Sequence, residues 1–409
     1  MIQSVIWPTK NRVECLQRCL RSFLPHRQGQ ALLVFDDAED PAPCRAMLQA
    51  TVPDAVHYDR ARKTTLLPQH LDKELAQFAV FGLSEFPTCI GANRNAGLLA
   101  TCDENIMMID DDMECQVTTP GSYSPRLSKS DPTKIEVYSN ETTALQAHPL
   151  SDANIIEMQT PLGEMTAAGM IRMSQFGVIG DCGMSTPQWH MLPPRMLQAD
   201  FPDAIHSRIV CRAAPHLSYS QTPTLMTGAI GLRNRWLPPF MPAGRASDDC
   251  FAGVVMRMYP GTLVAHLPAA MLHRPVKTNL LNPVDCIGYR QRTIGQLMSL
   301  LLARTTSPIN PDARDRLKSV GKQLESLICG DFLALLSDIF QASDQLMADY
   351  LDLLWPQVTA NQQIYLNREI QARQYNSQHP QPLQFSDAPD LQAVQKCVGL
   401  YAGLLQTWF

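Results

Sequence analysis

Three consecutive aspartates, Asp110, Asp111 and Asp112, follow directly after an apolar run at residues 106–109. Four adjacent apolar residues predict a strand that is buried on both faces, as in a parallel sheet. Open α/β sheets bind ligands at the carboxyl ends of such strands. Adjacent carboxylates repel one another, so a hard cation such as Mg²⁺ or Mn²⁺ is a natural counter-charge, and removing one acid should leave stability unchanged or slightly raised. The alternative interpretation is a solvated acidic turn.

The first third of the chain alternates apolar runs with stretches of helical periodicity. We expect strands at residues 4–7 (ended by Pro8), 31–35, 55–58 and 106–109, and helices at 13–23, 42–50, 71–81 and from 91 onwards. Such alternation is typical of a doubly wound α/β fold. No Gly-x-Gly-x-x-Gly follows the first strand and no Walker sequence occurs, so neither a dinucleotide fold nor a phosphate loop is indicated.

The remainder of the chain divides into an irregular middle and a helical end. Residues 116–160 are polar and poor in large apolar side chains, which predicts a long loop. Strands are expected at 176–184, 226–232 and 261–266, with a further apolar segment at 271–275 after a short loop. From about residue 283 the pattern predicts helices only. We therefore expect an α/β domain at 1–282 and a helical domain or appendage at 283–409.

The order of motifs in the first part resembles family-2-like glycosyltransferases of the GT-A fold, which have a Rossmann-like, mixed central sheet. Their first strand leads into a Pro-Thr-x-Asn-Arg-like turn, matched by residues 8–12, and their second strand ends in an acidic pair, matched by Asp36 and Asp37. Residues 93–98 match an Ala-Arg-Asn-x-Gly-Leu-like helix start, and residues 110–112 match the Asp-x-Asp signature. The resemblance covers roughly residues 1–282, which it makes the catalytic domain, and none of the helical region.

The resemblance implies a role for each matched position. Thr9 and Asp37 would lie against the base of a UDP- or GDP-linked sugar, and Arg94 would brace that pocket. Asp110 would approach the ribose or a metal-bound water, and Asp112 would bind Mn²⁺ or Mg²⁺ directly. An ordinary ion pair from Arg94 to Asp36 or Asp37 is the alternative. The nucleotide-sugar site would comprise Pro8, Thr9, Arg12, Asp36, Asp37, Arg94, Asn95, Asp110, Asp111 and Arg274.

A second acidic pair, Asp248 and Asp249, follows the natural N-cap Ser247. In the family that the chain resembles, an acidic pair here lies under the acceptor, and its second member acts as general base. Capping of a helix start is the alternative, because acids are favoured in the first helical turn. Asp181 could reach a sugar hydroxyl, although the role of a turn residue that bonds its own backbone explains it better.

A histidine after the last core strand commonly completes the metal site in GT-A enzymes. His273 fits this position best, beside Arg274, and would join Asp110 and Asp112 at the metal, with His266 as the reserve candidate. The resemblance therefore implies a glycosyltransferase that inverts the sugar carbon. A nucleotidyltransferase and a catalytically silent scaffold protein are the alternatives. The first would require a glycine-rich loop after the first strand, which residues 8–12 do not provide.

Composition limits the remaining possibilities. The net charge is −5 and 18% of residues are charged, so nothing suggests a nucleic-acid or membrane-surface partner. No apolar run approaches the ~18 residues of a membrane span. The 12 cysteines are scattered without disulfide-like spacing, which favours a reducing compartment. We therefore expect a cytoplasmic enzyme that could form homo-oligomers through its C-terminal helices.

Overall fold

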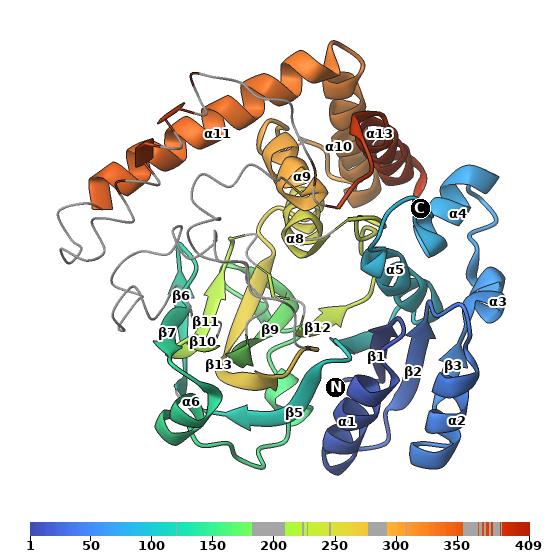
Figure 1. The fold of residues 1–409 in the computed structure, drawn as a ribbon, viewed down its shortest axis with the longest axis vertical. Helices are drawn as coiled ribbons and strands as arrows, with labels where there is room; N and C mark the ends of the chain where they lie inside the picture. The colour runs from blue at the N-terminus through green and yellow to red at the C-terminus, as the bar shows by residue number, and fades with distance from the viewer. Residues whose placement is uncertain are drawn as a thin grey trace.

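The computed structural model describes residues 1–119, 121–181, 209–222, 225–226, 228–244, 247–276, 293–307, 309–354 and 387–409, with scattered positions between 367 and 385. In this part of the chain the centre is a 13-stranded mixed sheet (Figure 1). Its main path has the strand order β3-β2-β1-β4-β12-β9-β13-β11-β6, and β5, β7, β8 and β10 lie off this path. The strands are β1 Ser4–Thr9, β2 Ala31–Asp36, β3 Val56–Tyr58, β4 Asn105–Ile109, β5 Met113–Thr118, β6 Ser122–Ser128, β7 Lys134–Tyr138, β8 Met165–Thr166, β9 Gly169–Asp181, β10 Ile209–Ala213, β11 His216–Ser220, β12 Ala229–Arg233 and β13 Leu263–His273.

The helices follow the predicted alternation in the first third of the chain and dominate the last third. They are α1 Val13–Phe23, α2 Ala42–Thr51, α3 Arg60–Lys63, α4 Lys73–Phe81, α5 Ile90–Ala100, α6 Glu141–Ala147, α8 Ser247–Met258, α9 Ile294–Ala303, α10 Ala313–Ile328, α11 Phe332–Leu354 and α13 Leu391–Thr407, with short 3₁₀ turns at Leu24–His26, Thr64–Leu66 and Glu157–Gln159. The mixed α/β class and the helical C-terminal region are thus as predicted.

The first half of the sheet is buried on both faces. Strand β1 pairs in parallel with β2 and β4, and β2 pairs in parallel with β3. Successive side chains of a strand point to opposite faces. Val5 and Trp7 therefore pack in one apolar cluster with α1 and α2, whereas Ile6 packs in the other with α4, α5 and α8. This double burial explains why the strands read as continuous apolar runs.

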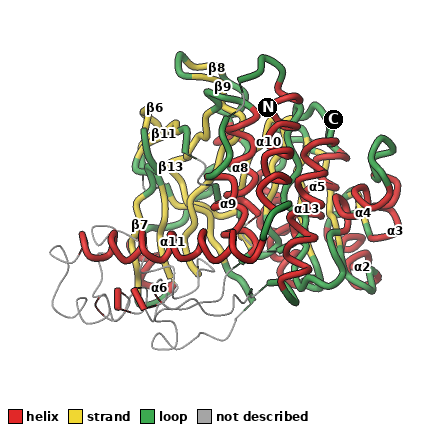
Figure 2. The backbone as a smooth tube through the Cα atoms, turned by 90° about the horizontal axis from the view of Figure 1, so that it is seen from above, coloured by secondary structure: helices red, strands yellow, loops and turns green. Residues whose placement is uncertain are grey.

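The C-terminal helices pack against the α/β part. Buried side chains of α9, α10 and α13 lie in the same apolar cluster as those of α4, α5 and α8. Figure 2 shows α8, α9, α10 and α13 side by side over one side of the sheet. Tyr401 of α13 donates its hydroxyl to the carbonyl of Pro239, 2.9 Å away. The predicted boundary at 282/283 lies outside the described residues, so the division into two domains stays a prediction.

Two predictions about the middle of the chain are wrong. The expected loop at 116–160 contains β6, β7 and α6, and the expected segments 261–266 and 271–275 form one strand, β13. Pro8 lies inside β1 rather than after it.

Among the described helices no single one is long and apolar enough to span a membrane. Ala313–Ile328 and Phe332–Leu346 meet the length and composition criteria only as a pair, bent by 102°.

Candidate active site at the carboxyl ends of β1, β2 and β4

Three parallel strands end at one edge of the sheet and bring the predicted acids together. The register pairs Thr9 with Asp36, so β1 and β2 end side by side. Strand β4 pairs in parallel with β1 on the side opposite β2 and ends at the same edge of the sheet. The backbone amide of Asp37 donates to the Thr9 carbonyl at 3.1 Å. The two acidic runs that the sequence placed at strand ends therefore border the same edge, as expected for a doubly wound sheet.

Asp111 is the innermost of the three adjacent aspartates. It accepts a hydrogen bond from Thr9 Oγ1 at 2.6 Å, and its other oxygen lies 2.8 Å from the Arg12 guanidinium. Its side chain is fully buried. Burial raises the pKa of Asp111 to about 7, against the opposing charge of Arg12. Asp111 is thus a support inside the turn, and Asp110 and Asp112 are the members of the turn that are less completely buried.

Asp112 lies between two cationic groups. Its Oδ2 accepts from Arg12 at 2.6 Å, and its Oδ1 lies 3.2 Å from Nε2 of His273. Burial opposes ionisation, but the partners His273 and Arg12 prevail and hold the pKa of Asp112 at about 2. The pKa of His273 is raised by Asp112, although burial acts in the opposite direction. Asp112 is therefore a carboxylate throughout the neutral range.

The pair of Asp112 and His273 fits one side of a divalent-cation site. Adjacent ligands of an octahedral Mg²⁺ at 2.0–2.1 Å lie about 3 Å apart, close to the 3.2 Å seen here. Nδ1 of His273 bonds to the backbone carbonyl of Asp181, which fixes the ring with Nε2 toward Asp112. Asp110 does not form a compact three-ligand set with these two residues, and one of its oxygens is held by Arg94.

Arg94 connects the aspartate turn with the second acidic pair. Its guanidinium donates to Asp110 at 2.8 Å and to Asp248 at 2.7 Å, and its side chain is 2% exposed. The ion pair to Asp36 or Asp37 that the sequence left open is not the one formed. Burial and the neighbouring acids raise the pKa of Asp110, although Arg94 opposes the shift. A planar fork is suited to hold two carboxylates in fixed positions.

Asp248 and Asp249 lie in the first turn of α8, as predicted. Asp249 accepts a hydrogen bond from the backbone amide of Leu225 at 3.3 Å. Desolvation raises its pKa to about 6, and the charge of Asp248 acts in the same direction. Its side chain nonetheless remains exposed to solvent.

Lys63 is a site residue that the sequence analysis missed. Its side chain is buried, and its ammonium bonds to Asp37 and, at 2.7 Å, to Asn93 Oδ1. Burial lowers the pKa of Lys63 in spite of Asp37. Asn93 in turn donates to the Thr9 carbonyl at 3.1 Å. Lys63 lies in a short basic stretch with no apolar periodicity, so only the tertiary structure identifies it as the partner of Asp37.

A cavity of about 650 Å³ opens beside Asp37. Its wall combines charged groups with an aromatic side and a backbone turn. The lining residues are Lys10, Asp37, Glu39, Arg60, Glu74, Gln77, Phe78, Phe81, Gly82, Leu83, Ser84, Glu85, Phe86, Cys89 and Lys396. The volume lies within the usual range of small-molecule sites, roughly 300–1,000 Å³.

Several predicted residues are engaged elsewhere. The Asn95 amide is bonded to the backbone of Ala79 and Phe240, so it clamps α5 in place. Arg274 pairs with Glu114 and Glu141, although its backbone amide donates to the Asp112 carbonyl. Their predicted contacts with a nucleotide sugar stay predictions that these bonds do not favour.

The reserve histidine and the first acid of the β2 pair also have partners away from the three aspartates. His266 lies buried between Gln175 and Ser220, and burial lowers its pKa to about 4. Asp36 pairs with His57 at 3.3 Å. Of the two histidines proposed for the metal, His273 is therefore the one that contacts the aspartate turn.

Comparisons with known proteins find only distant similarity. No protein-family model matches the chain, and no curated protein matches it. Among solved structures, glucosyl-3-phosphoglycerate synthase from Mycobacterium tuberculosis in complex with Mn²⁺, UDP and glucosyl-3-phosphoglycerate is 14% identical, with a TM-score of 0.33 over 74% of this chain and 77% of that one. The same enzyme in complex with phosphoglyceric acid is 12% identical, with a TM-score of 0.36 over 79% of each chain. Because these scores are low, we base the function on this chain's own residues.

Proposed function

We propose that this chain is a metal-dependent glycosyltransferase of the GT-A type. It would move a sugar from a UDP- or GDP-linked donor to an acceptor hydroxyl with inversion. The observation that carries the proposal is the double ion pair of Arg94, which joins Asp110 at the end of β4 to Asp248 at the start of α8. These two ion pairs bring Asp110 and Asp248 to one guanidinium, which supports a single site shared by the predicted donor turn and the predicted base helix.

The donor side begins at Thr9 and Asp37. We assign the nucleoside to the cavity beside Asp37, where Phe81 offers an aromatic surface and Lys10 a positive charge. The buried Lys63 keeps the Asp37 carboxylate in place. Because Asp37 then presents hydrogen-bond acceptors at the cavity wall, it suits the N–H edge of a base.

The metal side consists of Asp112 and His273. These two residues would hold Mg²⁺ or Mn²⁺, with Asp110 reaching the ribose or a metal-bound water. The bound cation would neutralise charge on the leaving nucleoside diphosphate. Arg12 keeps Asp112 ionised, and the Asp181 carbonyl orients His273.

The acceptor side is assigned to α8. Asp248 is tied to Arg94, whereas Asp249 is exposed and has its pKa raised toward neutrality. A base whose pKa lies near the working pH transfers protons most effectively. We therefore assign proton removal from the acceptor hydroxyl to Asp249. A single displacement assisted by one base inverts the configuration at the sugar carbon.

The test is turnover of UDP- and GDP-sugars with Mn²⁺, which is measured as release of the nucleoside diphosphate. Metal-dependent release that requires Asp112 would support the proposal. Release of pyrophosphate from a nucleoside triphosphate would instead identify a nucleotidyltransferase. Tight nucleotide binding without turnover on any acceptor tested would favour a silent scaffold. The cytoplasmic location and assembly through the C-terminal helices stay predictions, to be tested by cell fractionation and light scattering.

A further inference from the structure

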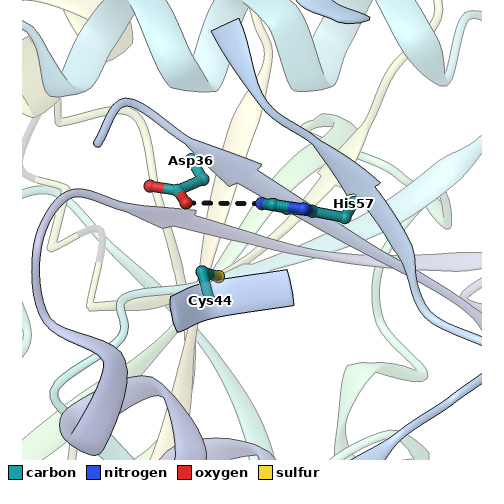
Figure 3. Close-up of side chains that lie close together, drawn as sticks. All are labelled: Asp36, Cys44 and His57. Carbon is teal, nitrogen blue, oxygen red and sulfur yellow. Dashed lines mark hydrogen bonds and ion pairs between the residues drawn. The ribbon is translucent and has the colours of Figure 1, made fainter. Parts of the chain in front are cut away.

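A second cluster of metal-ligating side chains lies outside the site described above. It consists of Asp36 at the end of β2, Cys44 in α2 and His57 in β3 (Figure 3). One potential ligand atom from each lies within 4.8 Å of the other two, and His57 Nε2 is 3.3 Å from Asp36 Oδ2. No other three histidine, cysteine, aspartate or glutamate side chains of the described residues bring their potential ligand atoms this close together.

Burial distinguishes this cluster from an ordinary acidic surface. Asp36 is 1% exposed and Cys44 is 2% exposed, and the side chain of His57 is 11% exposed. The other Asp36 oxygen accepts from the Ala38 backbone amide at 2.8 Å, which fixes the carboxylate plane. Three different ligand types, oxygen, sulfur and nitrogen, therefore converge in a nearly dry place on a rigid frame.

The ligand types select the class of cation. Thiolate and imidazole suit borderline-soft ions such as Zn²⁺, whereas Mg²⁺ and Mn²⁺ prefer oxygen. Zinc bonds of 2.0–2.3 Å place tetrahedral ligands about 3.4–3.6 Å apart, close to the distance between Asp36 and His57. The sulfur needs to move by about 1 Å at most to complete this geometry.

We propose that Asp36, Cys44 and His57 bind a Zn²⁺-like divalent cation, separate from the site at Asp112 and His273. Three protein ligands leave a fourth position for water or an added group. A cavity of about 380 Å³, lined by Asp36 and Cys44, gives access to it. When sulfur bonds the cation, the Cys44 thiol proton leaves to water, and neutral His57 offers the Nε2 lone pair while Nδ1 keeps its proton.

Charge complementarity supports this assignment. A divalent ion would compensate both the Asp36 carboxylate and the thiolate that Cys44 forms when it binds the ion.

The cation would join three consecutive elements. Strand β3 is the edge strand and has three partly buried residues, and it is held on one side by its pairing with β2 and by the stacking of Tyr58 on Phe35. Binding would fix β3 and α2 to the end of β2, directly beside Asp37. We therefore expect zinc to raise the melting temperature of the full chain, because any ligand that binds only the folded state stabilises it.

The experiment titrates Zn²⁺ alone into the full-length His273→Ala protein, so that the aspartate site does not contribute. Cys44→Ala and His57→Gln are made in this background, with the exposed Cys329→Ser as the matched control. We expect each cluster variant to lose at least about 100-fold in zinc affinity, since even an outer-shell change costs 10–100-fold. The control should bind as the background does.

Co²⁺ provides a second measurement that does not depend on the variants. A sulfur-to-cobalt charge-transfer band in the wild-type protein, lost in Cys44→Ala, supports the proposal. Should Cys44→Ala fail to fold, absence of that band in wild type, or a melting temperature unchanged by zinc, overturns it. Zinc affinity unchanged in folded Cys44→Ala also overturns it. Turnover with Mn²⁺ is measured separately, so failure of the glycosyltransferase proposal stays distinguishable.

Discussion

The two halves of the central sheet are built differently. In the half formed by β3, β2, β1 and β4, all neighbouring strands pair in parallel, and the connecting helices cover both faces. The pair of β4 with β12, where this half meets the other, is antiparallel. The other half mixes parallel and antiparallel pairs among strands from residues 113–273. The first half carries the proposed donor residues, and the second half brings His273 to the site. The proposed metal ligands thus come from both halves, with Asp112 from the parallel half and His273 from the mixed half.

The sharpest test of this comparison is Asp112→Ala, which removes the contact between the halves at His273. We expect turnover and metal-dependent nucleotide binding to fall below detection in calorimetry and kinetic assays. Because the folded pKa of Asp112 is about 2, below its ordinary value, its ionised form stabilises the fold by about 2 kcal/mol above pH 4. This contribution should be lost as pH falls through about 2.

Thermal unfolding of Asp112→Ala should therefore show a lower melting temperature at neutral pH and a smaller difference from wild type below pH 3. Asp349→Ala, an exposed change on α11, is the control and should alter neither property. Wild-type affinity for Mn²⁺ and nucleotide in Asp112→Ala would show that the metal lies elsewhere.

Asp249→Asn separates chemistry from donor binding. The variant keeps its shape but cannot take a proton, so kcat should fall by about 10²–10⁴ while nucleotide affinity stays near normal. Since the pKa of Asp249 is raised to about 6, wild-type kcat should rise with pH through that value, and the variant should lack this rise.

Asp248→Asn is the matched comparison. It should lose less in kcat, because its carboxylate holds Arg94 and is not the assigned base. Equal small losses in both variants would reduce the pair to a helix start, and the base would then be sought first at Asp181.

Lys63→Met tests the donor half by itself. The substitution leaves the buried Asp37 carboxylate without its ammonium partner, which typically costs about 3–5 kcal/mol of unfolding free energy. Denaturant unfolding measures the loss, and Lys73→Met, an exposed change in α4, is the control. A loss no larger than that of the control would mean that Asp37 does not need this partner.

Tyr401→Phe probes the helical region and should have the smallest effect. It removes one buried hydrogen bond to the Pro239 carbonyl and should cost about 1 kcal/mol of stability. Nucleotide affinity should not change, since Tyr401 itself does not line the cavity assigned to the nucleoside, although Lys396 of the same helix does. Tyr123→Phe, on an exposed side chain, is the matched control. A variant that remains stable and yet loses nucleotide affinity would contradict this division of labour.

The sequence predicted the parallel half well because its signals are local. Strands β1, β2 and β4 are apolar runs, and the ends of β2 and β4 are marked within a few residues by Asp36 and Asp110. The pairing of β1 with β2 and β4 then places these acids together without further information. Turn chemistry and helix starts follow the same local rules.

The other half could not be predicted because its strands depend on partners distant in sequence. Strand β6 is exposed almost throughout and is polar, so nothing local marks it as a strand. The sequence suggested a short loop between residues 266 and 271, but β13 continues through Pro268, with a shift in register where proline is tolerated. The partners of Asp112 show the same limit. Repulsion among three acids predicted that removing one would leave stability unchanged or slightly raised, whereas the contacts of Asp112 with Arg12 and His273 lead us to expect a loss of stability.

The double ion pair of Arg94 also bears on how such an enzyme could be re-engineered. An exchange of the region after residue 113 for that of another enzyme, made to change the acceptor, would separate this guanidinium from the carboxylate on α8. A buried arginine with one of its two acids removed is costly to accommodate. Grafts that carry an acid at the position of Asp248 would keep this ion pair, so, on the proposal that α8 lies at the acceptor, an exchange of the acceptor region should include this residue.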